Sequence, residues 1–433
     1  MTPGRAAAYA IRVEAERGRR LHRAFSDRVD SLEPRERGFA HELAWGTTRL
    51  RGRLDGLLDA HVSRSLSELD GPVLELLRLG TYQIHYMDSV PAYAAVSATV
   101  DQVRVEVGAR PTGFVNAVLR RVAADTTVPP EDMNSLLALT TWGSHPEWLV
   151  RRWLSRYNVI DVRRLVEHDN SQPPTSILPI GMTSKEALVR LAEEGIEASL
   201  AAEWSPCLRL ADTSSVASAL RALPISIVQD PASNLVARYA DVSSGTIVAD
   251  LCAAPGGKAL ALSDRAARVI ALDRSESRMR MVKDNAKRTE RPLELVVADA
   301  NSVPLVAADV VMVDAPCTGT ATLARHPDSR WRLKEEGIAE MAALQGRMLD
   351  AAADVVRPGG MLVYSTCTLE PEENERCVSD FLARHSEYVL EPSEAFKNED
   401  PGGAFVDSEG FLRVEPWRSG YDGSFAARLR KAL

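Results

Sequence analysis

Apolar side chains recur at helical spacing through the first third of the chain. After Pro72, which fits the first turn of a helix, Val73, Leu77 and Ile84 follow at intervals of four and seven residues. This spacing puts them on one face of a helix, which such a helix buries. Further helices are predicted over 42–58, from 88–91 onwards and over 111–121. The first third is therefore predicted to fold as an all-α bundle.

The pattern changes after a stretch rich in turn-forming residues at 125–134. Residues 145–153 have the spacing of a helix, and 176–180 form a short apolar run typical of a strand. Residues 184–194 are predicted as a helix that begins with a capping pattern and ends at Gly195. Together these elements predict a small α/β module.

Apolar runs then alternate with helical stretches to the end of the chain. Five runs are predicted as strands, at 246–250, 269–273, 293–299, 310–314 and 361–365. The alternation is typical of a largely parallel sheet covered by helices on both faces. Four of the five runs end in aspartate. Such an aspartate can simply cap the next helix, but ligands also bind beyond the carboxyl ends of these strands.

Length and composition fit a soluble protein of several domains. The chain has 433 residues, of which 45% are apolar and 26% charged. It has no apolar run long enough for a membrane span and no signal-peptide pattern, so we expect a cytoplasmic protein. The patterns above predict three domains: a helical domain at 1–130, the small α/β module at 140–226 and an α/β domain at 227–433.

The number and spacing of the cysteines argue against disulfide bonds and zinc binding. There are five, an odd number, and none forms a C-x-x-C pair, which argues against a disulfide framework and a zinc site, so no metal is expected. Cys252 and Cys377 fit ordinary packing positions, and Cys207 lies outside any motif. Cys317 and Cys367 instead stand among turn-forming residues just after two predicted strands. These two thiols are the candidates for chemistry.

Charge gives a weaker signal. The net charge of −8 argues mildly against indiscriminate nucleic-acid binding, although residues 1–64 hold thirteen arginines against nine acidic residues. Only seven of the 52 basic residues are lysines, and a codon preference for arginine over lysine explains this at least as well as phosphate recognition does. Arg325, His326 and Arg330 follow the first reactive cysteine and suit either phosphate binding or a solvated loop.

The turn after the first predicted strand of the large sheet is the candidate cofactor site. Gly256 and Gly257 allow the backbone to approach a ligand, and Lys258 follows where a helix is expected to begin. Asp273 lies 23 residues after Asp250, close to the spacing at which an acidic side chain reaches ribose hydroxyls. The G-x-G-x-x-G pattern of dehydrogenases is absent here. The turn therefore predicts a nucleoside cofactor.

Three motifs resemble the Nop/Sun family of S-adenosylmethionine-dependent RNA cytosine-C5 methyltransferases. They are Asp250-Leu-Cys-Ala-Ala-Pro-Gly-Gly-Lys258, Asp314-Ala-Pro-Cys-Thr-Gly-Thr320 and Ser365-Thr-Cys-Thr-Leu-Glu-Pro-Glu-Glu-Asn-Glu375, and they occur in the family's order. The segments 42–46, 77–83, 88–96 and 113–121 resemble the NusB-like domain of the family's bacterial Sun/Fmu branch, which methylates 16S ribosomal RNA. The resemblance covers nearly the whole chain.

This resemblance implies a fold and a set of roles. The fold would be multidomain, with an all-α NusB-like bundle, a small α/β linker module and a C-terminal α/β Rossmann-like methyltransferase domain. Cys367 would attack carbon 6 of the cytosine, Asp314 would hydrogen-bond the base near N3, and Cys317 would help to release the product. S-adenosylmethionine would be held by Cys252, Ala253, Ala254, Pro255, Gly256, Gly257, Lys258, Asp273, Asp299 and Asp314.

The implied partner is RNA, namely 16S rRNA or a small-subunit assembly intermediate. The protein is expected to be a monomer and to have no membrane partner. The target cytosine would be single-stranded or flipped out, because a stacked duplex hides carbon 6. Three departures from the family stand at Leu178–Ile180, where it often has Arg-Val-Asn, at Ala321 in place of Gly, and at Ser424 in place of Phe. The first puts RNA contacts of the small module in doubt.

Two alternatives stay open. One is a non-catalytic RNA-binding ribosome-assembly factor that keeps a methyltransferase fold, against which the two cysteines and Asp314 argue. The other is a methyltransferase for another base or for protein. Amino-group methylation of adenine would predict an aromatic residue after Asp-Pro-Pro or Asn-Pro-Pro, whereas Asp314-Ala-Pro-Cys317 offers a thiol.

Overall fold

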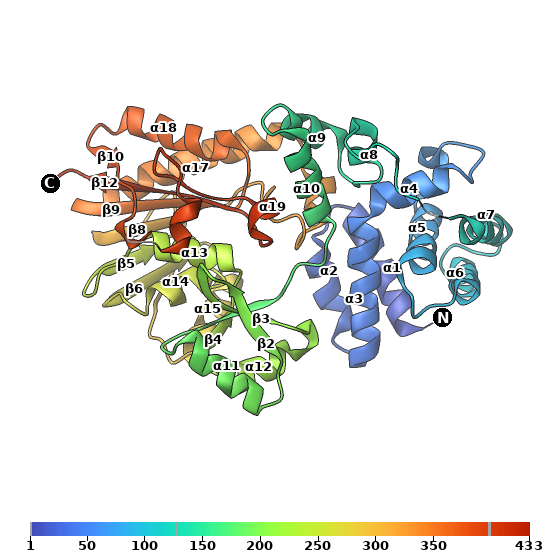
Figure 1. Ribbon diagram of the computed structural model, residues 1–433, viewed down its shortest axis with the longest axis horizontal. Helices are drawn as coiled ribbons and strands as arrows, with labels where there is room; N and C mark the ends of the chain where they lie inside the picture. Colours follow the sequence, from blue (N-terminus) through green and yellow to red (C-terminus); the bar gives the residue numbers. More distant parts are fainter. Residues whose placement is uncertain (1, 127, 397–399) are drawn as a thin grey trace. The chain divides into compact units, whose positions relative to one another are not determined.

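The chain folds into two compact units in a computed structural model that describes residues 2–126, 128–396 and 400–433 (Figure 1). The helical unit comprises Met1–Gln172 and Leu323–Leu333, and the sheet unit comprises Pro173–Thr322 and Lys334–Leu433. The predicted break at 125–134 and the predicted domains at 1–130 and 227–433 include residues 1, 127 and 397–399, which lie outside the described residues. No helix among the described residues is both long and apolar enough to span a lipid bilayer.

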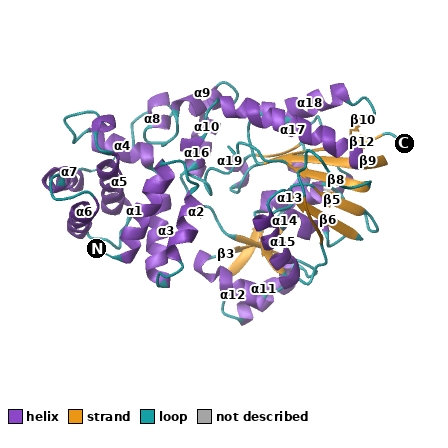
Figure 2. Ribbon diagram, turned by 180° about the vertical axis from the view of Figure 1, so that it is seen from behind, coloured by secondary structure: helices purple, strands orange, loops and turns teal. Residues whose placement is uncertain are grey.

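In its described residues the helical unit contains helices and loops but no strand, and the helices are purple in Figure 2. Its helices are α1 (Pro3–Glu16), α2 (Leu21–Val29), α3 (Pro34–Arg49), α4 (Arg51–Asp59), α5 (Gly71–Tyr86), α6 (Ala92–Glu106), α7 (Thr112–Ala124), α8 (Leu136–Thr140), α9 (Glu147–Leu154), α10 (Val159–Asp169) and α16 (Ser329–Arg332). The predicted helix after Pro72 is confirmed as α5, and the predicted stretch 42–58 is divided between α3 and α4.

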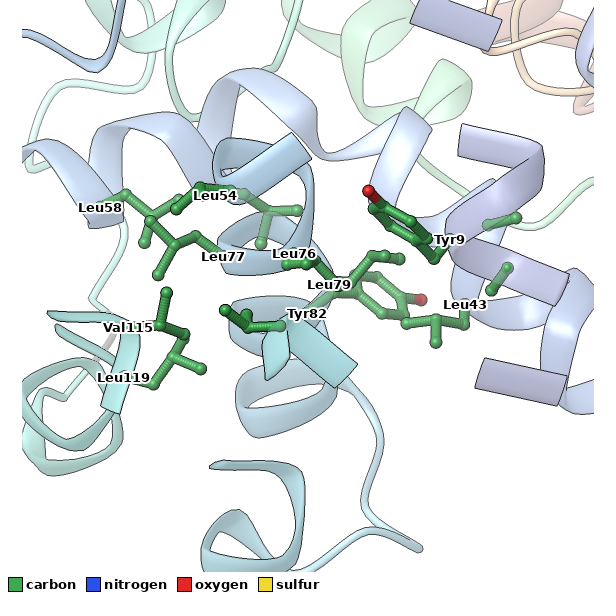
Figure 3. Packing of buried hydrophobic residues seen from close by; sticks show 14 of the residues in the cluster. Tyr9, Leu43, Leu54, Leu58, Leu76, Leu77, Leu79, Tyr82, Val115 and Leu119 are labelled. Carbon is green, nitrogen blue, oxygen red and sulfur yellow. The ribbon is translucent and has the colours of Figure 1, made fainter. Parts of the chain in front are cut away.

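Helix α5 is the centre of this unit. It contacts α1, α3, α4, α6 and α7, and its buried Leu76, Leu77 and Leu79 meet the apolar faces of these helices (Figure 3). Close packing also explains one glycine, because a Cβ at Gly46 would lie 2.0 Å from the ring of Tyr82. The amphipathic pattern read from the sequence thus becomes a single apolar core.

A segment from far along the chain completes the helical unit. Leu323–Leu333 carries Arg330, whose side chain is fully buried. Its guanidinium donates to the carbonyl oxygens of Ser144 at 3.1 Å and Asp169 at 2.8 Å, and to Oδ1 of Asn170 at 2.8 Å. Burial lowers the pKa of Arg330 to about 10, although the cation still holds these acceptors together.

The sheet unit begins with a small antiparallel sheet. Its strands β1 (Ser176–Pro179), β2 (Ala198–Ala202), β3 (Ser205–Leu210) and β4 (Ser226–Val228) lie in the order β2-β3-β1-β4, with α11 (Ser184–Glu193) and α12 (Val216–Ala222) between them in the chain. The predicted strand at 176–180 is confirmed as β1, and the predicted helix at 184–194 is α11, whose capping box joins Glu186 to Thr183, the residue just before the predicted range. The helix predicted at 145–153 is α9, which belongs to the helical unit.

A larger mixed sheet follows. Its strands are β5 (Ile247–Asp250), β6 (Arg268–Asp273), β7 (Glu294–Val297), β8 (Ala308–Asp314), β9 (Val356–Thr366), β10 (Tyr388–Leu390), β11 (Leu412–Val414) and β12 (Ser424–Lys431). Strands β5 to β9 are parallel and β10 to β12 pair antiparallel, in the order β10-β12-β9-β8-β5-β6-β7 with β11 beside β12. All five predicted strands are present, but the third ends at Val297 rather than at Asp299.

Helices cover both faces of this sheet. They are α13 (Pro231–Tyr239), α14 (Gly257–Leu262), α15 (Glu276–Arg288), α17 (Glu336–Val355), α18 (Glu375–Arg384) and the short α19 (Pro416–Ser419). Val248 of β5 packs with α13, α14 and α15, whereas its neighbour Ala249 packs with α17 and α18. Alternate side chains of one strand thus feed two separate cores, as expected for a covered parallel sheet.

The strand order of the large sheet has a switch point beside β5. From β5 the chain passes to β6 and β7 on one side, then returns to β8 and β9 on the other. Ligands of such sheets bind at this switch point, beyond the carboxyl ends of the strands. The three motifs singled out in the sequence follow β5, β8 and β9, and therefore lie at this end of the sheet.

Candidate active site

The turn after β5 is built around two glycines. Gly256 has a φ of +106°, a left-handed conformation that favours glycine. A Cβ at Gly257 would lie 3.2 Å from Nε2 of Gln229, so the glycine leaves room for this buried side chain. The backbone of the turn is tied to β6, because the N–H of Ala253 donates to the carbonyl of Leu272 at 2.9 Å. The predicted cofactor turn is thus held firmly at the switch point.

Asp250, the last residue of β5, is fully buried beside this turn. Its Oδ1 accepts from the backbone N–H of Cys252 at 3.3 Å, and its Oδ2 has no partner among the described residues. Burial, with the nearby carboxylate of Asp314, raises the pKa of Asp250 to about 7. An unsatisfied buried oxygen is costly. A donor group of a nucleoside bound at the turn would satisfy it.

The two other predicted acids lie in different settings. Asp273 accepts from the backbone N–H of Ser275 at 2.9 Å and lies 3.3 Å from Nη1 of Arg278. Arg278 also donates to the carbonyl of Ala254, so it links the end of β6 to the cofactor turn. Asp299 lies beyond β7, where hydrogen bonds from the backbone and side chain of Asn301 lower its pKa. Asp273 is therefore tied to the turn, and Asp299 makes a local turn of its own.

Asp314 ends β8 and is held by two neighbours. Its Oδ2 accepts from Nζ of Lys258 at 2.8 Å, and its Oδ1 accepts from Oγ of Ser365 on β9 at 2.8 Å. Burial alone would lower the pKa of Lys258, but the attraction of Asp314 outweighs it and the pKa is raised. Lys258 therefore stays charged and fixes the orientation of the Asp314 carboxylate.

The two candidate cysteines lie next to each other. Cys317 and Cys367 follow β8 and β9, which pair in register through Asp314 and Ser365. Their sulfur atoms are 3.3 Å apart, and the backbone N–H of Cys367 also donates to Sγ of Cys317 at 3.3 Å. The hydrogen bond to Cys367, together with burial, raises the pKa of the Cys317 thiol. The two thiols therefore share a hydrogen bond in which either sulfur can be the donor.

The remaining cysteines are placed as packing residues. Cys207 and Cys377 are buried, and burial raises the pKa of Cys207 to about 12 and that of Cys377 to about 11. Cys252 lies half-buried in the cofactor turn, where burial and the carboxylate of Asp250 raise its pKa. None of these three thiols is disposed to ionise, in contrast to a nucleophilic cysteine.

One proposed phosphate contact is wrong. The sequence predicts that Arg330 binds phosphate or lies in a solvated loop, but its side chain is fully buried and its Nη1 and Nη2 donate to carbonyl oxygens of the protein. Leu178 and Ile180 stand where the family that the chain resembles often has Arg and Asn. Both lie in an apolar core. Ala321 links the loop after β8 to the loop after β9, because its N–H donates to the carbonyl of Cys367 at 3.2 Å.

Several site residues escaped the sequence interpretation. Ser365 and the ion pair of Lys258 with Asp314 were missed because they depend on which strands are neighbours. A further set of buried polar side chains lies behind the cysteines, and its members are Thr318, Thr320, Gln345, Thr368, Glu370 and Glu373. The sequence signal for this set was the run of Glu, Asn and Thr residues after Cys367. Many polar residues close to a buried strand must find hydrogen-bond partners inside the protein.

Comparison with known families divides the chain in three. Residues 239–430 match the model described as 16S rRNA methyltransferase RsmB/F. Residues 6–124 match the NusB family, and residues 145–217 match the ferredoxin-like domain of RsmF/B-like methyltransferases. The expected multidomain fold, with a NusB-like bundle, a small linker module and a methyltransferase domain, is thereby confirmed.

Individual proteins are similar over most of the chain. A protein of Mycobacterium tuberculosis named as a methyltransferase is 33% identical over 92% of this chain and 89% of its own. Ribosomal RNA small subunit methyltransferase B of Vibrio vulnificus is 31% identical over 93% of this chain and 95% of its own. The crystal structure of PH0851 superimposes with a TM-score of 0.79 at 26% identity, covering 100% of this chain and 99% of that one.

Proposed function

Because the chain belongs to the RsmB/F family of 16S rRNA methyltransferases, we propose that it methylates carbon 5 of a cytosine in RNA through a temporary bond between Cys367 and carbon 6. The observation that carries the proposal is the pair of sulfur atoms 3.3 Å apart at the ends of neighbouring strands. Methylation of a nitrogen or oxygen atom needs no thiol, whereas methylation of this carbon needs a nucleophile and a way to release it.

The first step is covalent. Carbon 5 of cytosine is too weak a nucleophile to take a methyl group directly, so the Cys367 thiolate adds to carbon 6 and a sulfur–carbon bond forms. The electron pair displaced from the ring double bond then raises the density on carbon 5. Asp314, oriented by Lys258 and Ser365, hydrogen-bonds the base near N3 through a proton shared between the two, and this proton stabilises the negative charge that develops on the ring.

Release requires a second group. Once carbon 5 carries the methyl group, its proton must leave so that the double bond can re-form and the Cys367–carbon 6 bond can break. Cys317 lies within hydrogen-bond distance of Cys367 and acts in this step, as the base or as the group that positions it. As the base, Cys317 starts as a thiolate and ends as the S–H that donates to the released Cys367 thiolate; as the positioning group, it keeps its S–H throughout and another base takes the proton.

The cofactor turn fits the methyl donor that the family uses. S-adenosylmethionine, when bound, supplies an electrophilic methyl group. The unsatisfied Oδ2 of Asp250, the glycine backbone at Gly256 and Gly257, and the carboxylate of Asp273 would hold its amino-acid and nucleoside parts. Asn301 donates only to Oδ1 of Asp299, so Oδ2 of Asp299 could accept from the methyl donor without loss of these bonds.

We infer the substrate from the relatives. Proteins similar over more than nine-tenths of this chain are named small subunit methyltransferases, so the substrate would be 16S rRNA, free or in an assembly intermediate. The protein would act on it in the cytoplasm as a monomer.

A methyl-transfer assay tests the proposal. Purified protein, S-adenosylmethionine with a labelled methyl group and 16S rRNA should give labelled 5-methylcytidine after digestion to nucleosides. The Cys367→Ala protein should give less than about one thousandth of this rate, as for loss of a covalent nucleophile. RNA binding with no transfer would support the assembly-factor alternative, and label in any other nucleoside would contradict the proposed chemistry.

A further inference from the structure

A carboxylate behind the two cysteines joins the loops that carry them. Glu373 is fully buried. Its Oε2 accepts from the backbone N–H of Thr318 at 2.9 Å, the residue after Cys317. Its Oε1 accepts from the hydroxyl of Thr318 and from the hydroxyl of Thr368 at 3.2 Å, the residue after Cys367. One side chain therefore binds both loops, in each case at the residue that follows the cysteine.

An amide from a third element completes this arrangement. Nε2 of Gln345, on α17, donates to Oε2 of Glu373 at 2.9 Å and to the carbonyl oxygen of Pro316 at 2.9 Å. Pro316 precedes Cys317, so both flanks of that cysteine are fixed. The hydroxyls of Thr318 and Thr368 also lie 2.8 Å apart. We call Glu373, Thr318, Thr368 and Gln345 the loop clamp.

The chemistry of the clamp favours a role in geometry. Burial raises the pKa of Glu373, and its hydrogen bonds from Thr318, Gln345 and Thr368 oppose that rise. An apolar side chain of the same size would fill the space without this desolvation cost. Hydrogen bonds, unlike apolar contacts, are directional and fix where each loop lies relative to the other. The arrangement therefore trades stability for a defined separation of two backbones.

We propose that Glu373 is a positioning residue that sets the separation of the Cys317 and Cys367 sulfur atoms, so that Cys317 reaches the adduct formed by Cys367. The second clause rests on the proposed function, and the first does not. Glu373 itself touches neither sulfur in this arrangement and acts through Thr318 and Thr368.

Disulfide formation measures the separation without any RNA. Diamide oxidises two thiols to a disulfide, and the two electrons and two protons that the thiols lose reduce its N=N bond. The rate of Cys317–Cys367 disulfide formation, followed by peptide mass mapping of the full-length protein, should fall about tenfold in Glu373→Gln, which equals about 1.4 kcal/mol of lost alignment. Glu373→Asp, which keeps the charge, should recover part of the rate.

Matched variants make the result specific. Glu372→Gln changes a neighbouring, partly exposed carboxylate that pairs with Arg376, and should leave the rate within about twofold. Should Glu373→Gln fail to fold, Thr318→Val removes only the hydroxyl bonds and should slow the disulfide about threefold. An unchanged rate in folded Glu373→Gln or Thr318→Val, or an equal loss in Glu372→Gln, would overturn the proposal.

Methyl transfer supplies the second readout. In Glu373→Gln the share of protein trapped on RNA per methyl group transferred should rise about tenfold, because attack by Cys367 persists while release slows. A merely structural role would lower the active fraction and leave this ratio unchanged, which would contradict the proposal. If the unaltered protein transfers no methyl group at all, the proposed function fails, while the disulfide rates still decide the role of Glu373.

Discussion

Arg330 and Glu373 are two buried charged side chains that hold chain segments together in different ways. Arg330 donates mainly to backbone carbonyls, including those of Ser144 and Asp169. Glu373 accepts mainly from side chains, two of which belong to the residues that follow Cys317 and Cys367. A backbone carbonyl accepts a hydrogen bond whatever side chain its residue carries. The contacts of Arg330 therefore stabilise the fold without depending on the types of the neighbouring residues. Side-chain donors must be specific residues, and the glutamate contact thus orients a site.

The largest expected effect is loss of the arginine. Arg330→Ala leaves several buried oxygen atoms without a donor, and should lower the free energy of unfolding of the helical unit by about 4 kcal/mol. Urea unfolding followed by tryptophan fluorescence reports this unit, because five of the seven tryptophans lie in it, namely Trp45, Trp142, Trp148, Trp153 and Trp331. Arg104→Ala, an exposed control, should change it by less than about 0.5 kcal/mol. Equal losses of stability in Arg330→Ala and Arg104→Ala would contradict the role of Arg330 in stabilising the helical unit.

Asp250 offers a third buried ionisable side chain, with one oxygen left unpaired among the described residues. Its pKa is about 7 in the folded protein and near 3.8 in the unfolded chain. Between these pH values the folded protein holds a proton that the unfolded chain has lost, so stability should fall as the pH rises from about 4 to about 7, by up to about 4 kcal/mol. Unfolding measured across this range should show the fall in the unaltered protein and a flatter profile in Asp250→Asn. The same slope in both would show that Asp250 is not its source.

The two charged side chains should separate in the disulfide assay. Arg330→Lys keeps the charge but loses the planar fork, so it should destabilise the helical unit and leave the rate of Cys317–Cys367 disulfide formation within about twofold. Glu373→Gln should do the reverse, slowing the disulfide about tenfold. A slow disulfide in Arg330→Lys would show that the helical unit, too, sets the cysteine geometry, and the comparison would fail.

The smallest effect is expected at Tyr364. Its hydroxyl donates to the backbone carbonyl of Glu373 at 2.5 Å, not to the carboxylate. Tyr364→Phe should therefore cost about 1 kcal/mol of stability and leave the disulfide rate within about twofold. A larger loss of rate than in Glu373→Gln would move the positioning role from the carboxylate to the backbone of this loop. Thermal unfolding and diamide oxidation of the same sample give both values.

The parallel strands and the helical bundle were predictable because they leave a local pattern. Apolar runs ending in aspartate predicted β5, β6 and β8, and apolar spacing after Pro72 predicted α5. Strands β10 and β11 were missed because three residues give no apolar run, and β12 was missed because its arginines at alternate positions interrupt the run.

The contacts of the site were less predictable than its members. Cys317, Cys367 and Asp314 were singled out by type and position, but the bond from Lys258 to Asp314 depends on the order of the strands. The use of Leu323–Leu333 by the helical unit has no periodic signal either. Buried polar pairs join residues far apart in the sequence, so only the folded chain shows them.

Trapping the covalent intermediate tests the account most directly. Cys317→Ala protein, mixed with 16S rRNA and S-adenosylmethionine and separated under denaturing conditions, should accumulate a protein–RNA adduct that the unaltered protein does not hold. The Cys317→Ala/Cys367→Ala double variant should form none. An adduct that persists in the double variant, or normal methyl transfer by Cys367→Ala alone, would contradict the assignment of Cys367 as the attacking thiol.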